Sequence, residues 1–443
     1  MISHQEQLAE QRTREVLLTQ PAVSQLVIDS PPGAGKTGIV ERLAIQGAWV
    51  TGERVMIAGQ TNGQSFDLAF RLASGWPDRP VYLFVRRGLP IPIKLDPLEN
   101  LNIIADISRV ESGPSIVISN ASKWSYVDPE KFNADLLIVD EAYQLRDSQF
   151  AQIAGLADRH VLVGDPGQIA PVISSDVSRW RDMPDGPHIP APSALLARRP
   201  TSTLRMTLPV TRRLPADTTS YIQPAFYPDL PFESTSAEHE RGLSVDAGSG
   251  DCWDEVIDKA SEGASILMAE LPGKISGEFD DALSQQIVSL IERLLQRNAL
   301  LEDDGTQIQL TADQIGVVCA HRSQVYCVQE KLPASLSDVH VETAERFQGL
   351  ERRVIIVHHP LSGRLSLSDF QLDSGRLCVM TSRHRVTCFV MARAGLAERL
   401  QLAAPSLDRI LGASHESVHG GRFAHRRFLQ QLMDSERIIS VQP

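Results

Sequence analysis

The sequence is poor in cysteine and in aromatic residues, and it has no long apolar run. Its five cysteines are odd in number and form no Cys-x-x-Cys pair, which argues against a disulfide framework or a zinc module and fits a reducing compartment. No apolar run approaches the roughly 18 residues that span a bilayer, and charges occupy the N-terminal stretch where a secretory signal is apolar. We therefore expect a cytoplasmic protein that makes no membrane contact.

The chain also lacks an excess of basic residues. Lys and Arg number 43 against 55 Asp and Glu, which gives a formal charge of -12 at pH 7. No global positive field therefore attracts nucleic acid, and any such binding must use a local groove. The length of 443 residues and the hydrophobic content of 42% are those of an ordinary globular protein with two or three domains.

Two series of short apolar, β-branched runs alternate with polar or helical stretches. The first series lies at residues 25–29, 54–59, 81–85, 115–119, 136–140 and 160–165. The second lies at residues 265–270, 314–320, 353–359, 377–382 and 389–392. Apolar runs bounded by turn residues predict the buried parallel strands of α/β sheets. Two α/β domains in tandem are the economical interpretation.

The composition between and after these series suggests where the domains end. The stretch between them is rich in Pro, Ser, Arg and Asp and has weak periodicity, which predicts an irregular crossover. Apolar residues with helical spacing at 287–295 and 428–432 predict helices that cover a sheet. We expect a first domain with an N-terminal helix, a crossover that carries an arginine motif, a second domain and a helical tail, at residues 1–173, 174–250, 251–400 and 401–443.

A glycine-rich segment follows the first predicted strand. Residues 30–37 read SPPGAGKT and run into a helical pattern, which is the strand-loop-helix context of a phosphate-binding loop. Backbone N–H groups and the helix N-terminus suit phosphates, a lysine reaches the terminal phosphates, and a threonine ligates magnesium. The alternative is a plain glycine-rich turn. We expect ATP to bind at Gly33, Ala34, Gly35, Lys36 and Thr37, with Mg²⁺ on Thr37.

The predicted strand 136–140 ends in two adjacent carboxylates, Asp140 and Glu141. Such a pair at the end of a buried strand is costly without a cation. Asp140 is expected to hold Mg²⁺, and Glu141 to polarise the water that attacks ATP. A solvated acidic turn is the alternative, and the phosphate-binding loop upstream argues against it.

Three further segments resemble motifs of the superfamily 1 helicases. Residues 140–144 (DEAYQ) look like the DEAxQ box, residues 161–171 (VLVGDPGQIAP) are similar to the GDxxQLPP element, and residues 341–351 (VETAERFQGLE) closely resemble the TxxxxQGxE motif. The pattern is most like the DEAxQ-box branch that contains nonsense-mediated-decay helicases. The resemblance implies two tandem RecA-like P-loop domains with parallel sheets and a nucleotide cleft between them.

The resemblance also implies roles for particular residues. The resemblance implies that Gln168 senses the γ-phosphate. It also implies that Gly349 and Glu351 respond to the bound nucleotide. The nucleic-acid contacts that it implies come from Thr61, Asn62, Thr343 and Gln348. A polar loop that caps a helix is the alternative at Thr61 and Asn62.

Arginines that reach the γ-phosphate are expected from two segments. Arg383 matches the arginine of the VAxTRA motif, and residues 208–215 resemble the LxxxYR motif. The second motif gives Arg213 or Arg212, depending on its anchor, and we prefer Arg213. The N-terminal glutamine that reads adenine is Gln11 or Gln7, and we assign Gln11. A structural ion pair is the alternative for each arginine.

These patterns together predict an ATP-dependent translocase or helicase of superfamily 1. It would hydrolyse ATP with Mg²⁺ to move on, or remodel, single-stranded DNA or RNA, alone or with a protein partner in a larger complex. The alternative is a nucleotide-dependent switch ATPase that acts on a protein partner without unwinding nucleic acid. The polymer, the direction of movement and the oligomeric state are left open.

Overall fold

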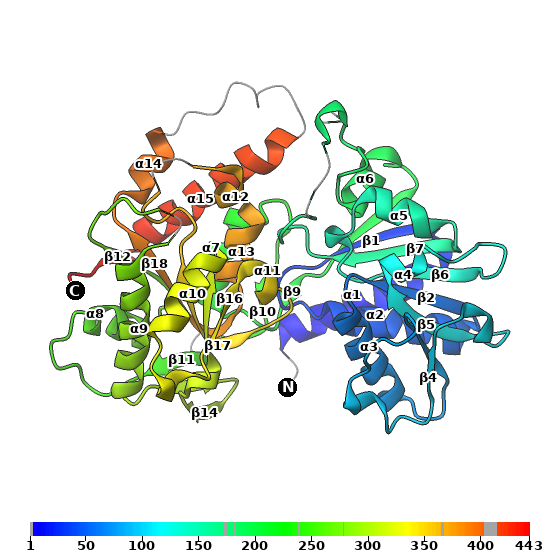
Figure 1. Cartoon of the computed structure of the whole chain (residues 1–443), viewed down its shortest axis with the longest axis horizontal. Coiled ribbons are helices and arrows are strands. Elements are labelled where there is room, and N and C mark those ends of the chain that lie inside the picture. The colour runs from blue at the N-terminus through cyan, green and yellow to red at the C-terminus, as the bar shows by residue number, and fades with distance from the viewer. Residues whose placement is uncertain are drawn as a thin grey trace. The chain divides into compact units, whose positions relative to one another are not determined.

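A computed structural model describes residues 3–171, 173, 176–180, 183–237, 240–277, 279–364, 367–402 and 414–443. The chain forms two compact units (Figure 1). Unit 1 comprises Met1–Pro166 with Ala170–Pro209, and unit 2 comprises Gly167–Ile169 with Val210–Pro443. Each unit has a parallel sheet with helices and buried apolar clusters on both of its faces. No helix in the described part of the chain is long and apolar enough to cross a membrane.

Unit 1 is built on an eight-stranded parallel sheet, in the order β4-β3-β5-β2-β6-β7-β1-β8. The six predicted strands are present, and two short ones are added at the edges. The strands are β1 Gln25–Asp29, β2 Arg54–Gly59, β3 Val81–Phe84, β4 Leu101–Ile104, β5 Ser115–Asn120, β6 Ala134–Val139, β7 Ala157–Gly164 and β8 Thr203–Thr207. The edge strands were missed because half-exposed residues interrupt their apolar runs.

Helices cover both faces of this sheet. Alternate residues of a strand point to opposite faces, so Leu26 and Ile28 join one apolar cluster and Val27 joins the other. The first cluster includes residues of α1 His4–Thr19, α2 Lys36–Ile45 and α3 Asn62–Gly75, and the second includes residues of α4 Ala121–Trp124, α5 Asp147–Ala154 and α6 Ala191–Arg198. Strands buried on both faces are the reason why the sequence shows continuous apolar runs rather than alternation.

The stretch 174–250, interpreted from composition as an irregular crossover, contains ordered elements that belong to both units. Strand β8 pairs with β1 in register Gln25↔Thr203 and so completes the sheet of unit 1. Unit 2 begins at Val210. Its first elements are β9 Val210–Thr211, α7 Ala216–Phe226, β10 Glu233–Ser234 and β11 Arg241–Ser244. Pairing partners far away in the sequence order this stretch, which composition does not reveal.

Unit 2 has a six-stranded parallel sheet, in the order β16-β15-β17-β18-β12-β19. Its strands are β12 Ile266–Leu271, β15 Ile315–Cys319, β16 His340–Thr343, β17 Arg352–His358, β18 His384–Arg393 and β19 Ile438–Ser440. A separate antiparallel sheet joins β11 to β13 Leu300–Asp303 and β14 Thr306–Gln309. Both units therefore have the parallel α/β architecture that the sequence predicts.

One predicted strand of unit 2 is wrong. Residues 377–382 lie almost entirely in helix α13, Ser374–Thr381, whose N-cap Asp373 accepts a hydrogen bond from the backbone N of Arg376 at 2.9 Å. Leu377 and the three residues after it are fully buried. A short apolar run that is buried all round does not distinguish a helix from a strand, and the polar N-cap decides in favour of a helix.

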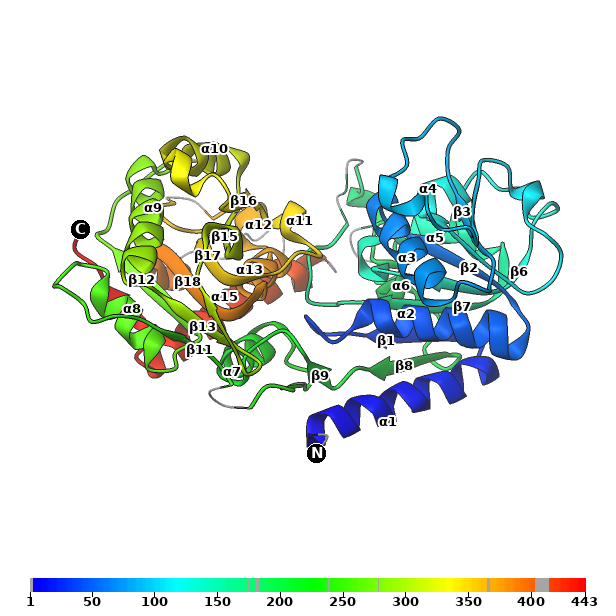
Figure 2. The same ribbon diagram turned by 90° about the horizontal axis from the view of Figure 1, so that it is seen from below.

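The helices of unit 2 also form two layers. One layer includes α8 Asp254–Ser261, α9 Asp281–Gln296 and α10 Arg322–Lys331, and the last two lie side by side (Figure 2). The other includes α7, α11 Ala344–Phe347, α12 Asp369–Leu372, α13, α14 Leu396–Leu402 and α15 Ser414–Asp434. The predicted helices at 287–295 and 428–432 are confirmed within α9 and α15. Of the predicted tail 401–443, residues 403–413 lie outside the described residues, and β19 adds a strand beside β12.

Candidate functional site

The glycine-rich segment of unit 1 has the predicted strand-loop-helix order. Strand β1 ends at Asp29, and α2 begins at Lys36. Gly33 and Gly35 have φ values of 73° and 86°, in the left-handed region where a Cβ atom is disfavoured. These two positions therefore need glycine for the loop to fold back over the start of α2. The free N–H groups at that helix end favour an anion such as phosphate.

Carboxylates surround the lysine of this loop. The Nζ atom of Lys36 lies 3.4 Å from Oε1 of Glu141 and 4.0 Å from Oδ2 of Asp165. Asp140 is 9% exposed. Burial and repulsion by Glu141 raise the pKa of Asp140 to about 7, although the charge of Lys36 opposes both effects. A single lysine among three carboxylates leaves an excess of negative charge that suits a cation.

The backbone of Glu141 is in the left-handed conformation, with φ 52° and ψ 43°. Only a few per cent of non-glycine residues adopt it, and such strain costs on the order of 1–3 kcal/mol and is concentrated at functional sites. The turn also packs tightly on β7, because a Cβ atom on Gly164 would lie 3.0 Å from the backbone N atoms of Ala142 and Tyr143. The strand end thus holds the Glu141 backbone in a defined position.

A buried carboxylate that sequence analysis missed lies behind the loop. Asp29, at the end of β1, has no exposed surface. Its Oδ1 atom accepts a hydrogen bond from the hydroxyl of Tyr143 at 2.6 Å, and its Oδ2 atom accepts one from Nε of Arg205 at 2.6 Å. Burial, together with the charge of Asp29, raises the pKa of the Tyr143 hydroxyl well above its ordinary value. This cluster ties the phosphate-binding loop to the acidic turn and to β8.

Thr61 and Asn62 lie at the start of α3, directly after β2. The Oγ1 atom of Thr61 accepts a hydrogen bond from the backbone N of Gln64 at 3.3 Å, and Oε1 of Gln64 accepts one from the backbone N of Thr61 at 3.0 Å. Thr61 therefore caps the helix, as the alternative interpretation of this segment expected. Asn120, at the end of β5, donates from Nδ2 to Oδ1 of Asn62 at 2.5 Å.

A pocket of about 720 Å³ opens beside these two residues, and we call it the Thr61 pocket. It lies where β2, β3 and β5 end, and it is lined by Gln60, Thr61, Asn62, Arg86, Leu89, Asn120, Ser122, Lys123 and Tyr126. Tyr126 is 84% exposed. These lining residues include two cations, an exposed aromatic ring and several amides, but no carboxylate.

The cations and the aromatic ring of the Thr61 pocket were not predicted from the sequence. Lys123 and Tyr126 follow the buried strand β5, and Arg86 follows β3. A polar stretch after a buried strand was the available signal, since parallel strands bring their carboxyl ends to one edge. That signal does not show which connections share a pocket.

In unit 2, the segment Gly167–Ile169 places Gln168 beside the predicted TxxxxQGxE motif. Nε2 of Gln348 donates a hydrogen bond to Oε1 of Gln168 at 3.4 Å. The approach depends on small residues. A Cβ atom on Gly375 would lie 2.5 Å from the carbonyl O of Gln168, and one on Gly167 would lie 2.3 Å from the ring of Tyr227. Two of the predicted site residues therefore meet.

A second group of predicted residues gathers around Glu351. Its Oε2 atom accepts a hydrogen bond from Nε of Arg213 at 2.8 Å, and Nη1 of Arg213 lies 3.5 Å from the carbonyl O of Ser382. Burial alone would raise the pKa of Glu351, but the charge and hydrogen bond of Arg213 lower it below the usual range. The next residue, Arg383, is 1% exposed. The structure thus places Arg213 in an ion pair and the Arg383 side chain inside unit 2.

The remaining predicted residues lie at element ends or on the surface. Thr343 ends β16, precedes α11 and is 8% exposed. Gly349 has a φ value of 84° and follows the cap of α11. Gln11 is exposed on α1, where its Nε2 atom donates to Oε1 of Glu15 at 3.2 Å. The roles of these residues stay predictions.

Comparison with known proteins gives one family match. Residues 280–395 match the AAA domain family, and no curated protein matches the chain. Among solved structures, the chain is similar to arterivirus nonstructural protein 10 (helicase), with 15% identity, 89% of this chain and 64% of that chain covered, and a TM-score of 0.44. The same helicase in complex with DNA has 14% identity, 90% and 66% coverage and a TM-score of 0.45. A PRRSV helicase has 14% identity, 86% and 54% coverage and a TM-score of 0.43.

The chain therefore spans less than two thirds of the length of these solved helicases. The class of the protein is indicated by the phosphate-binding loop with its left-handed glycines in unit 1 and by the AAA domain match in unit 2. The helicase motifs follow the family's order through both units. The chain thus resembles the superfamily 1 helicase-like P-loop ATPases in its motifs, and residues 280–395 match the AAA domain family.

Proposed function

We propose that this chain hydrolyses ATP in order to move along, or remodel, single-stranded DNA or RNA. One observation carries the proposal. The loop that contains Lys36 and the Thr61 pocket both follow the carboxyl ends of strands in the same parallel sheet, which is the edge where α/β sheets bind ligands. A nucleotide site and a basic, aromatic pocket on one rigid edge suit an ATPase that grips a polymer.

The residues of the loop fit a nucleotide with its metal. Left-handed glycines leave the N–H groups at the start of α2 open to phosphates. Burial and repulsion by Glu141 raise the pKa of Asp140, so a cation beside these carboxylates would be stabilising. Thr37 and Asp140 would hold Mg²⁺, which when bound neutralises charge that develops on the phosphates. Lys36 would contact the terminal phosphates, and Glu141 would accept the proton of the attacking water.

The other nucleotide contacts rest on the family resemblance. Gln168 would respond to the γ-phosphate, and Arg213 and Arg383 would stabilise the charge of the transition state. Gln11 would read adenine. Gly349 and Glu351 would relay the nucleotide state, because Glu351 is bonded to Arg213 within unit 2.

The Thr61 pocket is the proposed contact with nucleic acid in unit 1. Exposed aromatic rings stack on bases whatever the sequence, and cations beside them hold the backbone phosphates. Tyr126 would supply the ring, and Arg86 and Lys123 would supply the cations. Thr61 and Asn62 would add sequence-independent contacts with the backbone. Thr343 and Gln348 are the proposed contacts of unit 2.

Steady-state ATP hydrolysis by the wild type and by Glu141→Gln, with and without single-stranded DNA or RNA, tests the proposal. We expect one polymer to stimulate hydrolysis, the stimulation to weaken as salt rises, and Glu141→Gln to abolish turnover. The polymer that stimulates is the track. Hydrolysis that is indifferent to both polymers would contradict a nucleic-acid motor, and a phosphorylated small-molecule product would indicate a kinase.

A matched pair of tyrosines tests the pocket itself. Tyr126→Ala is expected to raise the polymer concentration that half-saturates the stimulation by about fivefold or more, because a stacked base contributes roughly 1–3 kcal/mol. Tyr326→Ala, at a tyrosine of unit 2 that is 65% exposed, should leave that concentration unchanged. Equal effects of the two substitutions would remove the Thr61 pocket from the proposed track.

A further inference from the structure

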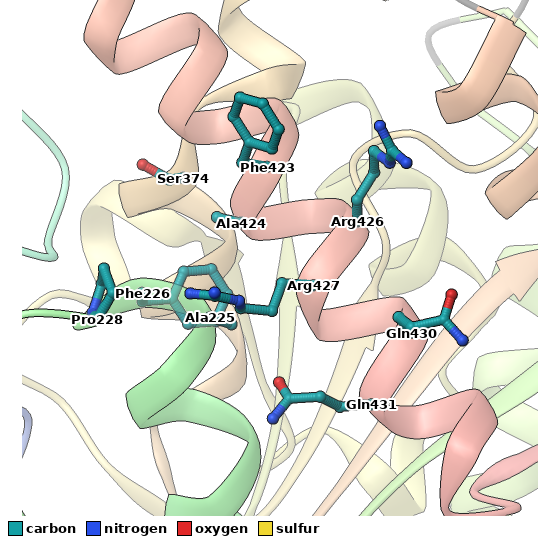
Figure 3. Close-up of a pocket in the computed structure, with 10 residues that line it drawn as sticks. All are labelled: Ala225, Phe226, Pro228, Ser374, Phe423, Ala424, Arg426, Arg427, Gln430 and Gln431. Atoms are coloured by element: carbon teal, nitrogen blue, oxygen red, sulfur yellow. The ribbon is translucent and has the colours of Figure 1, made fainter.

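A second cavity lies in unit 2, between the C-terminal end of α7 and the helix α15 (Figure 3). We call it the α7–α15 groove. It has a volume of about 630 Å³ and is lined by residues that include Phe226, Phe423, Arg426 and Arg427. None of the residues assigned to ATP or to nucleic acid lines it. The groove is therefore separate from the residues proposed to bind ATP and nucleic acid.

Hydrogen bonds and a contact between aromatic rings join the two helices that form the α7–α15 groove. Nη1 of Arg427 donates a hydrogen bond to the carbonyl O of Pro224 at 2.8 Å, and Nε2 of Gln431 donates one to the carbonyl O of Ser220 at 3.0 Å. The ring of Phe226 packs against that of Phe428, with centroids 6.0 Å apart. Because the two helices are already held together, the groove loses little conformational entropy when a ligand binds.

The rim of the groove combines an exposed ring with two adjacent cations. Phe423 is 65% exposed, and Figure 3 shows its ring standing on the same helix as Arg426 and Arg427. Within the described residues no carboxylate pairs with either arginine, and no acidic residue lines the groove. The sequence of α15 has no Asp or Glu between residues 417 and 433. The nearest acid along the helix, Asp434, accepts a hydrogen bond from Gln430 at 2.8 Å.

This local excess of positive charge stands out on a chain whose formal charge is -12. Guanidinium groups match carboxylates through paired N–H donors. Phenylalanine and arginine are also enriched at protein interfaces. The chemistry of the rim therefore selects a ligand with carboxylates around a large apolar side chain.

A peptide fits the groove better than a nucleic-acid strand. The groove is formed by helices of the layer that covers the sheet, whereas Thr343, the proposed nucleic-acid contact of unit 2, lies at a strand end. Strand-binding grooves track the backbone with a row of cations and several stacking rings. Here one exposed ring stands beside two cations, and the amides of Gln430 and Gln431 are suited to peptide backbone groups.

We propose that the α7–α15 groove binds an acidic peptide segment of a partner protein, in which one aromatic or large aliphatic residue is flanked by carboxylates. The apolar residue inserts beside Phe423 and Phe226. The flanking carboxylates pair with Arg426 and with the N–H groups of Arg427 that do not bond to Pro224. The groove would thus link an ATPase to the complex in which it works.

Fluorescence anisotropy with the full chain tests this site. The probe is a fluorescein-labelled peptide in which a tryptophan is flanked on both sides by glutamates. One analogue carries lysines in place of the glutamates, and another carries alanine in place of the tryptophan. We expect the acidic tryptophan peptide to bind about tenfold or more tightly than either analogue, because both the charge and the ring contribute.

Substitutions locate the binding. Arg426→Glu and Phe423→Ala should each weaken the binding of the acidic tryptophan peptide by about tenfold. Arg79→Glu, at an exposed arginine of unit 1, makes the same charge change and should have no effect. Arg426→Glu breaks no hydrogen bond among the described residues, so its fold should persist. Basal ATP hydrolysis, which the proposal leaves unchanged in both variants, reports on that fold.

Three outcomes would overturn the proposal. The first is equal binding of the three peptides, and the second is binding that Arg426→Glu and Phe423→Ala leave intact. The third concerns a single-stranded oligonucleotide. If Arg426→Glu weakens its binding and the acidic peptide does not compete with it, the groove binds nucleic acid instead. These outcomes are independent of polymer-stimulated hydrolysis, so failure of the groove and failure of the proposed motor are distinguishable.

Discussion

Replacing His425 by leucine should make unit 2 less sensitive to acid. His425 lies on α15 with no exposed surface, and neither of its ring nitrogens has a hydrogen-bond partner among the described residues. Its ring meets that of His359 with centroids 5.5 Å apart, and His358 and Arg399 also interact electrostatically with His359. A positive charge at this position would be buried without a counter-charge, so the folded protein keeps the ring neutral.

The size of the effect follows from linkage. Burial lowers the pKa of His425 from 6.5 to about 3. The stability that comes from a depressed pKa is complete above the pKa of the unfolded chain and is lost as the pH falls toward that of the folded protein. Between pH 7 and pH 5 the unfolded state gains about three quarters of a proton at this histidine, and the folded state gains almost none. That difference costs the wild type about 2 kcal/mol.

Urea unfolding at pH 7 and at pH 5 measures the effect. The wild type should lose about 2 kcal/mol more unfolding free energy between these pH values than His425→Leu does, because leucine has a similar volume and no proton to bind. His4→Leu, at an exposed histidine of α1, is the control and should behave like the wild type. Equal pH dependence of the wild type and His425→Leu would refute the reasoning, since it would mean that the folded protein protonates His425.

Three further substitutions probe other contacts. Tyr143→Phe removes a hydrogen bond to the buried carboxylate at the end of β1 and should lower the unfolding free energy by about 1–3 kcal/mol in urea titrations. Arg393→Met leaves Asp280 buried without its two 2.8 Å bonds and should cost roughly 3–5 kcal/mol in the same assay. Gly375→Ala puts a Cβ atom 2.5 Å from the carbonyl O of Gln168, so ATP turnover should fall about tenfold or more while ATP binding, measured by calorimetry, persists.

Matched controls separate these effects from general damage. Tyr82→Phe removes a hydroxyl from another buried tyrosine of unit 1 and should be nearly neutral. Gly242→Ala adds a Cβ atom with nothing within 4 Å and should leave turnover unchanged. If Arg393→Met lowers the unfolding free energy by less than about 1 kcal/mol, Asp280 is protonated or solvated in the variant. Unchanged turnover in Gly375→Ala would show that the position of Gln168 does not limit hydrolysis.

Local patterns were enough for much of the architecture. The apolar runs of β1, β2, β3, β5, β6 and β7 appear as predicted because a strand buried on both faces needs them. The same criterion failed at residues 377–382, where a helix is buried all round. It also missed β8, whose side chains are half-exposed at the sheet edge. Periodicity reports burial, so it is reliable only where burial differs between a helix and a strand.

Some features of the candidate site depend on neighbouring residues, and others depend on residues that are far apart in the sequence. Glycines and a lysine adjacent in the sequence predict a phosphate-binding loop, because the loop's shape depends on neighbouring φ values. The bond between Tyr143 and Asp29 joins residues 114 apart in the sequence, and the ion pair of Arg213 with Glu351 joins residues 138 apart. No local pattern encodes such pairs.

By itself the sequence determined two parallel α/β sheets, a glycine-rich loop between a strand and a helix, and an acidic strand end, since each depends on residues within a few positions of one another. Only the tertiary structure decided that Arg86, Lys123 and Tyr126 share a pocket with Thr61, and that α15 forms a groove with α7. The physical reason is that strand order and helix packing bring distant connections together. Those arrangements depend on the burial of the whole core, which no short segment contains.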